Sequence, residues 1–218
     1  MAVNEILVLS VLHNLHKDND YYSLDILNRL LKQIAPGVIC VELSPENLAA
    51  ENIDEILAYR TEYNAILPYA AENGCALIAL EPEQPKYDEL VNAYRAQNKA
   101  IDETEAEKVE VFGLFVTQLY DQLFQDWDSV MAVNSACTDY AFKLKHNFQA
   151  ALFGEKEAEF WDGWNQNFFN EIMRANSRFS GERILVTVGA EHKYWLLEAL
   201  KDVKGIRLMS LQDVGEAY

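Results

Sequence analysis

Short apolar runs separated by amphipathic stretches dominate the first eighty residues of the chain. The runs are rich in Val, Leu and Ile, as strands buried on both faces are, and they cover Ile6–Leu12, Val38–Leu43 and Cys75–Leu80. Helical spacing of apolar residues runs from Leu24 to Ile34, and a second helical stretch runs from about Asn52 to Glu72. The order β-α-β-α-β predicts a parallel sheet with helices packed on its faces.

The strand pattern disappears between residues 85 and 178 and returns at Arg183–Gly189 and Gly205–Leu211. The intervening segment has a helical composition rich in Glu, Ala, Gln, Phe, Tyr and Trp. We therefore predict one α/β domain, residues 1–218, with a mostly parallel sheet of four to five strands flanked by helices. The helical insertion at 85–178 lies between the third and fourth strands and forms a cap. Its aromatic residues favour core packing, with the wall of a pocket as the alternative.

The charge of the chain bears on its partners. It carries 35 acidic and 18 basic residues, which gives a formal net charge of −17 at pH 7. Charge of this sign repels phosphate backbones and anionic lipid surfaces, so we expect neither nucleic acid nor a membrane as a partner. Solubility is the simplest interpretation of the acidity. Attraction of a metal ion or of a cationic substrate is the alternative.

The cysteines and the amino-terminal run indicate a compartment. The chain has three cysteines and no CxxC spacing, which is typical of free thiols in a reducing environment. The first apolar run lacks a basic leader and is too short to span a membrane. The sequence therefore predicts a cytoplasmic protein without a secretion signal.

Polar side chains follow three of the predicted strands. His13 comes directly after the first strand, Glu42 lies at the end of the second, and His192 follows the fourth. Because the carboxyl ends of parallel strands meet at one edge of a sheet, we expect these groups to converge in a crevice there. The alternative is that the histidines are satisfied locally and that Glu42 forms a structural ion pair with an Arg or Lys.

Two imidazoles and a carboxylate suit two kinds of catalytic site. They are a common ligand set for one divalent metal ion, here Mn, Co, Zn or Fe. Without a metal, a carboxylate can orient a histidine that acts as the base for water. His192 lies near a predicted helix amino terminus, which favours the neutral imidazole. His16 faces either the crevice or solvent, and His146 is interpreted as a helix-surface residue.

Three motifs carry a family resemblance. The segments are "SVLH" (Ser10–His13), "VICVEL", which contains Glu42, and "VTVGAEH" (Val186–His192). Together they resemble motifs of the TraB/Tiki superfamily, which includes erythromycin esterase-like and ChaN-like proteins. The segment from Tyr59 to Pro82 is similar to that family's third-strand region. The resemblance covers the two sheet-forming ends, about half of the chain.

The chain also departs from the family pattern. Ser10 stands where the family usually has Gly, and "FNEIMRAN" has Phe169 where the family often has Arg, with Arg174 one turn later as a candidate replacement. The resemblance implies an α/β fold with a central His-Glu-His cluster. The candidate catalytic or metal-binding residues are His13, Glu42 and His192. The candidate substrate-binding residues are His16, Glu62, Asn170 and Arg174.

Three functions remain open on these residues. The first is a hydrolase that cleaves a peptide or ester bond in a peptide or small-molecule substrate, with or without a metal ion. The second is a ligand-binding or regulatory protein that keeps the crevice without the chemistry. The third is a partner-binding protein that uses the acidic, aromatic insertion, and a homo-oligomer is one form this could take.

Overall fold

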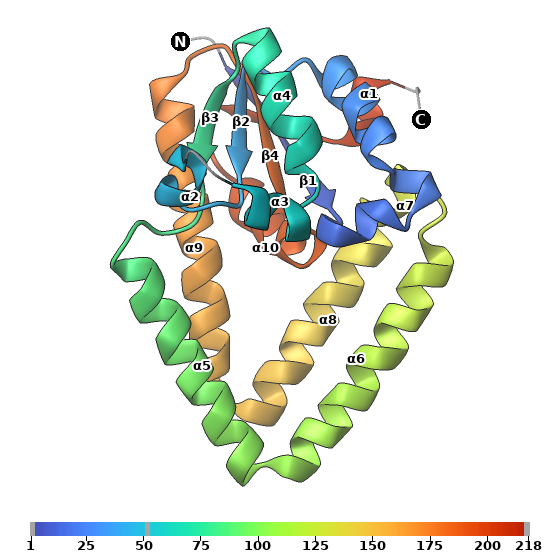
Figure 1. Ribbon diagram of the computed structural model, residues 1–218, viewed down its shortest axis with the longest axis vertical. Helices are drawn as coiled ribbons and strands as arrows, with labels where there is room; N and C mark the ends of the chain where they lie inside the picture. The colour runs from blue at the N-terminus through green and yellow to red at the C-terminus, as the bar shows by residue number, and fades with distance from the viewer. Residues whose placement is uncertain (1–2, 51–52, 216–218) are drawn as a thin grey trace.

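The computed structural model describes residues 3–50 and 53–215. Its centre is a five-stranded sheet in the order β3-β2-β4-β1-β5, with every neighbouring pair parallel (Figure 1). The strands are β1 (Asn4–Val11), β2 (Val38–Val41), β3 (Ala76–Ala79), β4 (Arg183–Gly189) and β5 (Ile206–Met209). The α/β fold predicted from the sequence is therefore confirmed, and β5 lies at the sheet edge.

Helices cover both faces of the sheet. The helices outside the segment between β3 and β4 are α1 (Leu24–Ile34), α2 (Pro45–Ala49), α3 (Asp54–Tyr59), α4 (Tyr63–Asn73) and α10 (Ala190–Leu200). Three 3₁₀ turns are η1 (His13–Lys17), η2 (Asp20–Tyr22) and η3 (Leu211–Val214). Among residues 3–50 and 53–215, no helix has the length and apolar character that a membrane crossing requires.

The segment between β3 and β4 is helical throughout its length. It contains α5 (Lys86–Thr104), α6 (Ala106–Asp126), α7 (Val130–Val133), α8 (Ala136–Phe153) and α9 (Glu155–Arg178). Figure 1 shows α5, α6, α8 and α9 extending from the carboxyl edge of the sheet, with α5 and α6 joined at the far tip. We call α5–α9 the cap.

Alternation along the strands divides the core into two layers. Leu7 and Leu9 of β1 face one layer, which includes side chains of α1 and α4, whereas Ile6 and Val8 face the other, which includes side chains of α9 and α10. Successive side chains of a strand point to opposite faces. Both faces are therefore buried, which explains why β1, β2 and β4 have continuous apolar sequences.

The second predicted helix is wrong in one respect. The stretch expected from about Asn52 to Glu72 is two helices, α3 and α4, separated by residues 60–62; Asn52 itself lies outside the described residues. Arg60 has φ −109° and ψ 72°, which is not helical. The break turns Arg60, Thr61 and Glu62 toward polar partners at the end of the sheet.

The strand register places the ends of the central strands together. Val11 of β1 pairs with Gly189 of β4, and Val41 of β2 pairs with Thr187 of β4. The residues that follow β1, β2 and β4 therefore emerge at the same edge, beneath the cap. Glu81, after β3, lies at this edge too, because its backbone N–H donates to the Leu43 carbonyl.

Candidate functional site

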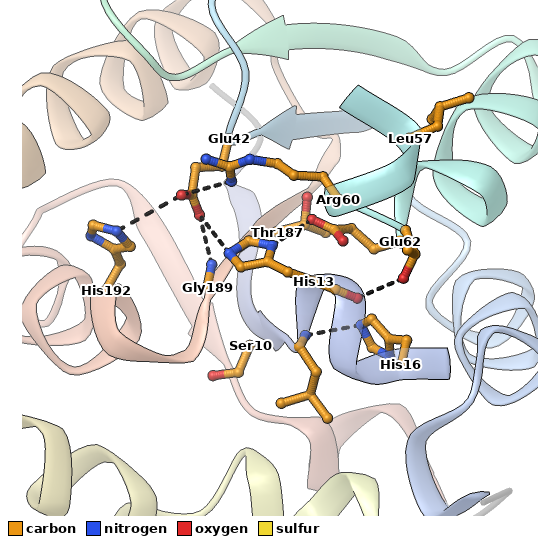
Figure 2. A network of polar contacts seen from close by, with 12 residues as sticks. Ser10, His13, His16, Glu42, Leu57, Arg60, Glu62, Thr187, Gly189 and His192 are labelled. Atoms are coloured by element: carbon orange, nitrogen blue, oxygen red, sulfur yellow. Dashed lines mark hydrogen bonds and ion pairs between the residues drawn. The ribbon is translucent and has the colours of Figure 1, made fainter. Parts of the chain in front are cut away.

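The structure brings His13, Glu42 and His192 together at the carboxyl edge of the sheet (Figure 2). The Glu42 carboxylate lies between the two imidazoles: its Oε2 is 4.0 Å from His13 Nε2, and its Oε1 is 3.9 Å from His192 Nε2. Both distances exceed those of direct hydrogen bonds. The Glu42 side chain is 6% exposed, so a buried charge occupies the centre of the cluster.

Two donors compensate the charge of Glu42. Arg60 Nη1 lies 2.8 Å from Oε1, and the Gly189 backbone N–H donates to Oε2 at 2.7 Å. Burial by itself raises the pKa of Glu42. The charge of Arg60, the two imidazoles and the Gly189 hydrogen bond outweigh that effect, and the pKa lies well below its ordinary value. Glu42 is therefore an ionised carboxylate at neutral pH.

His13 is oriented by a second buried carboxylate. Its Nδ1 lies 2.8 Å from Glu62 Oε1, and the Glu62 side chain is fully buried. Burial lowers the pKa of His13. The hydrogen bond to Glu62 and the charge of Glu42 raise it by more than burial lowers it, so the pKa lies above its ordinary value of 6.5. Because the Nδ1–H donates a hydrogen bond to Glu62, Nε2 carries the lone pair of the neutral ring. This nitrogen faces Glu42.

The backbone of His13 is in an uncommon conformation. Its φ is 51°, in the left-handed region that residues other than glycine rarely adopt. The Thr61 hydroxyl donates to the His13 carbonyl at 2.6 Å and holds this conformation. Strain of this kind is concentrated at functional sites, where the surrounding structure enforces it. The break between α3 and α4 therefore supports both the backbone and the ring of His13.

His16 has a structural role. Its Nε2 accepts from the Leu12 backbone N–H at 2.9 Å, so its Nδ1 carries the proton and donates to the Tyr22 carbonyl at 2.6 Å. The residue is 2% exposed, and burial, the main cause, lowers its pKa. A neutral His16 thus fixes the turn that presents His13. It faces neither the crevice nor solvent, so both alternatives expected from the sequence are wrong.

His192 is held from the cap. Asn165 Nδ2 donates to the Trp161 carbonyl at 2.8 Å, which leaves Asn165 Oδ1 to accept from His192 Nδ1 at 2.8 Å. The ring also stacks on Trp161, with centroids 4.5 Å apart and planes 19° apart. Burial lowers the pKa of His192 to about 4, although Glu42 opposes the shift. His192 is therefore neutral, with its Nε2 lone pair on the side of Glu42.

Arg60 contacts a second carboxylate, that of Glu81. Its Nη2 donates to Glu81 Oε1 at 3.1 Å, and burial, opposed by Arg60, raises the pKa of Glu81 to about 7. The sequence analysis did not include Glu81 or Gly189 in the site. The missed signal for Glu81 is its position, because it follows the third strand as Glu42 follows the second.

Two cavities meet at the cluster. The larger, of about 490 Å³, extends from Glu42 and His192 into the cap. Its aromatic walls are Tyr87, Tyr94, Phe112, Phe160, Trp161 and Trp164. The smaller, of about 210 Å³, lies on the other side and is lined by His13, Gly189 and His192 among others. Glu191 and His192 line both cavities, so the cluster forms the boundary between them.

The interpretation of His146 as a surface residue is wrong. Its side chain is 10% exposed, its ring stacks on Trp161 at a centroid distance of 3.6 Å, and its Nε2 lies 3.0 Å from Glu191 Oε2. Lys145 Nζ and the Tyr120 hydroxyl donate to the same Glu191 carboxylate. The packing of α8 against α9 and α10 buries this face, which the sequence of α8 alone does not reveal.

The structure does not bring Asn170 and Arg174 to the cluster. Both lie on α9 and line a shallow surface hollow, where Asn170 accepts from Gln166 and Arg174, with a side chain 76% exposed, pairs with Glu171. Arg174 therefore does not replace the arginine of the family pattern. Ser10 is fully buried and lines neither site cavity, so its hydroxyl does not crowd a ligand there.

The cluster does not fit the metal site expected from its residue types. Among residues 3–50 and 53–215, no group of three or more His, Cys, Asp or Glu side chains is arranged to hold a metal ion. The guanidinium of Arg60 already forms an ion pair with Glu42 Oε1 and supplies the positive charge that a metal would bring. The residues present thus match an ion-paired carboxylate better than a coordination sphere.

Comparisons of the chain with protein-family models, with curated proteins and with solved structures found no match. The resemblance to the TraB/Tiki superfamily therefore stays a prediction.

Adding one methyl group at Gly189 tests the cluster directly. A Cβ there would lie 2.7 Å from His13 Nε2, whereas φ −52° and ψ 145° are acceptable to alanine. We expect Gly189→Ala to keep the fold and displace the His13 ring from Glu62, which lowers its pKa in an NMR titration. Gly163→Ala, where a Cβ meets nothing within 4 Å, is the control. An unchanged His13 titration in Gly189→Ala would contradict the geometry.

Removing Arg60 tests the charge balance. Arg60→Met leaves Glu42 and Glu81 uncompensated, and we expect a loss of about 3 kcal/mol at pH 7 in denaturant unfolding. The pKa of Glu42 is held below its ordinary 4.5 in the folded protein, so its stabilisation is present at pH 7 and fades as the pH falls below that value. The deficit of the variant should shrink over the same range.

The control for Arg60 is Arg207→Met. Arg207 is 59% exposed and pairs with Glu5 at 2.9 Å, and an exposed pair of this kind contributes about 0–1 kcal/mol. Equal losses in the two variants, or a loss in Arg60→Met that does not change with pH, would show that Arg60 does not neutralise the buried carboxylates.

Proposed function

We propose that the protein is a metal-independent hydrolase in which His13 is the general base that activates water. The observation that carries the proposal is the orientation of His13, whose Nδ1 is bound to the buried Glu62 while Nε2 faces the cluster. A carboxylate-oriented imidazole with a free nitrogen is the arrangement that general base catalysis requires.

The cluster suits a water molecule as nucleophile. His13 Nε2 and His192 Nε2 lie 4.0 and 3.9 Å from the two oxygens of Glu42, and a water has two protons to donate to such acceptors. When His13 takes one proton, the imidazolium is 2.8 Å from Glu62 Oε1 and 4.0 Å from Glu42 Oε2. Both carboxylates stabilise that charge, which lowers the cost of the proton transfer.

Arg60 is the candidate electrophilic group. Its guanidinium lines the larger cavity, and its side chain is 27% exposed. A negative oxygen that develops on a substrate carbonyl would compete with Glu42 and Glu81 for the same N–H groups. Because the pKa of Glu81 is raised to about 7, this carboxyl is the one that can lose its charge most readily and free Arg60.

The cap limits the class of substrate. A volume of about 490 Å³ matches a single small molecule, and the six Phe, Tyr and Trp residues among the seventeen that line the cavity suit an aromatic body. An ester or amide at one end of such a molecule would lie against Glu42, Arg60 and His192, which line this cavity. The water on His13 would then approach it from the adjoining smaller cavity. We therefore favour a small-molecule substrate over a peptide, and an ester over an amide because its leaving group departs more easily.

The charge arrangement also favours an alternative. Both oxygens of Glu42 already have partners, Arg60 and the Gly189 N–H. A protein that binds an apolar ligand beneath the cap without cleaving it needs Glu42 only as a neutralised buried charge, and these two partners already provide that. Saturable binding of aryl esters with no turnover would support that ligand-binding function.

A variant of His13 tests the proposed role. We expect the wild-type protein to hydrolyse an aryl ester such as p-nitrophenyl phenylacetate, and His13→Ala to lower kcat/KM by about 10²–10⁴-fold. Asn170→Ala, which changes a residue away from the cluster, is the matched control. Chelation with EDTA should leave the rate unchanged. Activity that EDTA abolishes and that Mn, Co, Zn or Fe restores would refute the metal-independent mechanism.

The pH profile tests the pairing with Glu62. The neutral imidazole is the base, so kcat/KM should rise with pH through the pKa of His13, which is raised above 6.5 by Glu62 and Glu42 despite burial. Glu62→Gln removes one of these charges, so the inflection should move to lower pH while the plateau falls. Glu55→Gln, an exposed change on α3, is the control. An inflection that stays in place would exclude Glu62 as the orienting group.

A further inference from the structure

A third cavity lies apart from the cluster. It has a volume of about 560 Å³ and lies where α7, the start of α8, α10 and the end of β5 meet. It shares no lining residue with the two cavities at His192. Its aliphatic wall consists of Leu7, Met131, Leu197, Met209 and Leu211. Cavities of this size and lining are typical of sites for small ligands.

A buried ion pair forms the polar end of this cavity. Lys193 is 6% exposed, and its Nζ donates to Asp139 Oδ2 and to the Asn134 carbonyl, both at 2.8 Å. Two contacts leave one of the three ammonium N–H groups without a described acceptor. Asp139 Oδ1 is buried and has no partner among the described residues. Both residues line the cavity, and the pair contains one donor and one acceptor that no described residue satisfies.

We propose that this cavity binds a small aliphatic molecule with a primary carboxamide head. The amide carbonyl accepts from Lys193, and the amide N–H donates to Asp139 Oδ1. The aliphatic tail lies along the two methionines and the leucines of the wall, where flexible thioether side chains adapt to its shape. Such a ligand satisfies the buried acceptor, which is otherwise costly to leave unpaired.

The charge of the pair selects the head group. Lys193 and Asp139 neutralise each other, so a neutral head with both a donor and an acceptor matches them. A carboxylate is attracted by Lys193 but repelled by Asp139, and it has no proton for Oδ1. An ammonium is attracted by Asp139 but repelled by Lys193, and it offers no acceptor to the Lys193 N–H. This inference concerns a separate cavity and does not depend on the reaction proposed for His13.

Methionine methyl NMR tests the proposal. The full chain with labelled methionine methyl groups is titrated with hexanamide, hexanoate and hexylamine at pH 7. We expect saturable shifts at Met131 and Met209 with hexanamide and at least about tenfold weaker binding of the two charged compounds. Met173 lines a different surface hollow and is the internal control, with no shift.

Two variants complete the experiment. Ala136→Trp places a large ring in the lining of the cavity and should abolish the shifts, while an unchanged Met173 signal shows that the fold is intact. Asp139→Asn leaves Lys193 uncompensated and should reverse the preference, so that hexanoate binds more tightly than hexanamide. Absence of shifts in the wild type, equal binding of the three compounds, or shifts that persist in Ala136→Trp would overturn the proposal.

Discussion

The buried carboxylate of Glu42 is the constraint that organises this end of the molecule. A carboxylate that is 6% exposed is costly unless donors surround it. Arg60 reaches it from the break between α3 and α4, and the Gly189 N–H reaches it from the end of β4, where the absence of a Cβ leaves room for the His13 ring. The helix break and the glycine therefore both belong to the surroundings of one buried charge.

The same break presents the groups that hold His13. Thr61 secures its backbone in the left-handed region, and Glu62 binds its ring. Three consecutive residues, 60–62, thus serve Glu42 and His13 together. On the opposite side, Asn165 of the cap fixes His192. One imidazole is positioned by the sheet and its connections and the other by the cap, so the chemistry of the cluster depends on how the cap packs against the sheet.

The sequence predicts much of this arrangement because the sheet is parallel. Continuous apolar runs identify the strands, and a parallel order brings their ends to one edge, which is sufficient to place His13, Glu42 and His192 together. An ion pair of Glu42 with an Arg or Lys was one alternative from the sequence, and the structure shows that pair with Arg60. Arg60 itself was not identified as the partner, because the composition around it remains helical and gives no sign of the break. The locations of Asn170 and His146 depend on which faces of α9 and α8 pack inward, a tertiary property that spacing along one helix does not determine.

Consecutive residues at the start of α10 face different cavities. Side chains of neighbouring helix residues are about 100° apart around the axis, so His192 turns to the cluster while Lys193 turns to the third cavity. Asn134 connects the two sides, because its carbonyl accepts from Lys193 and its Oδ1 accepts from the backbone N–H of Ser10, three residues before His13. A ligand on Lys193 can shift the positions of the His13 and His192 rings only if Asn134 has two positions and the ligand binds the protein more tightly in one of them. Ser10 lies near the end of β1, and Lys193 follows the end of β4. A change in the position of Asn134 would therefore reach His13 and His192 through the ends of these two strands.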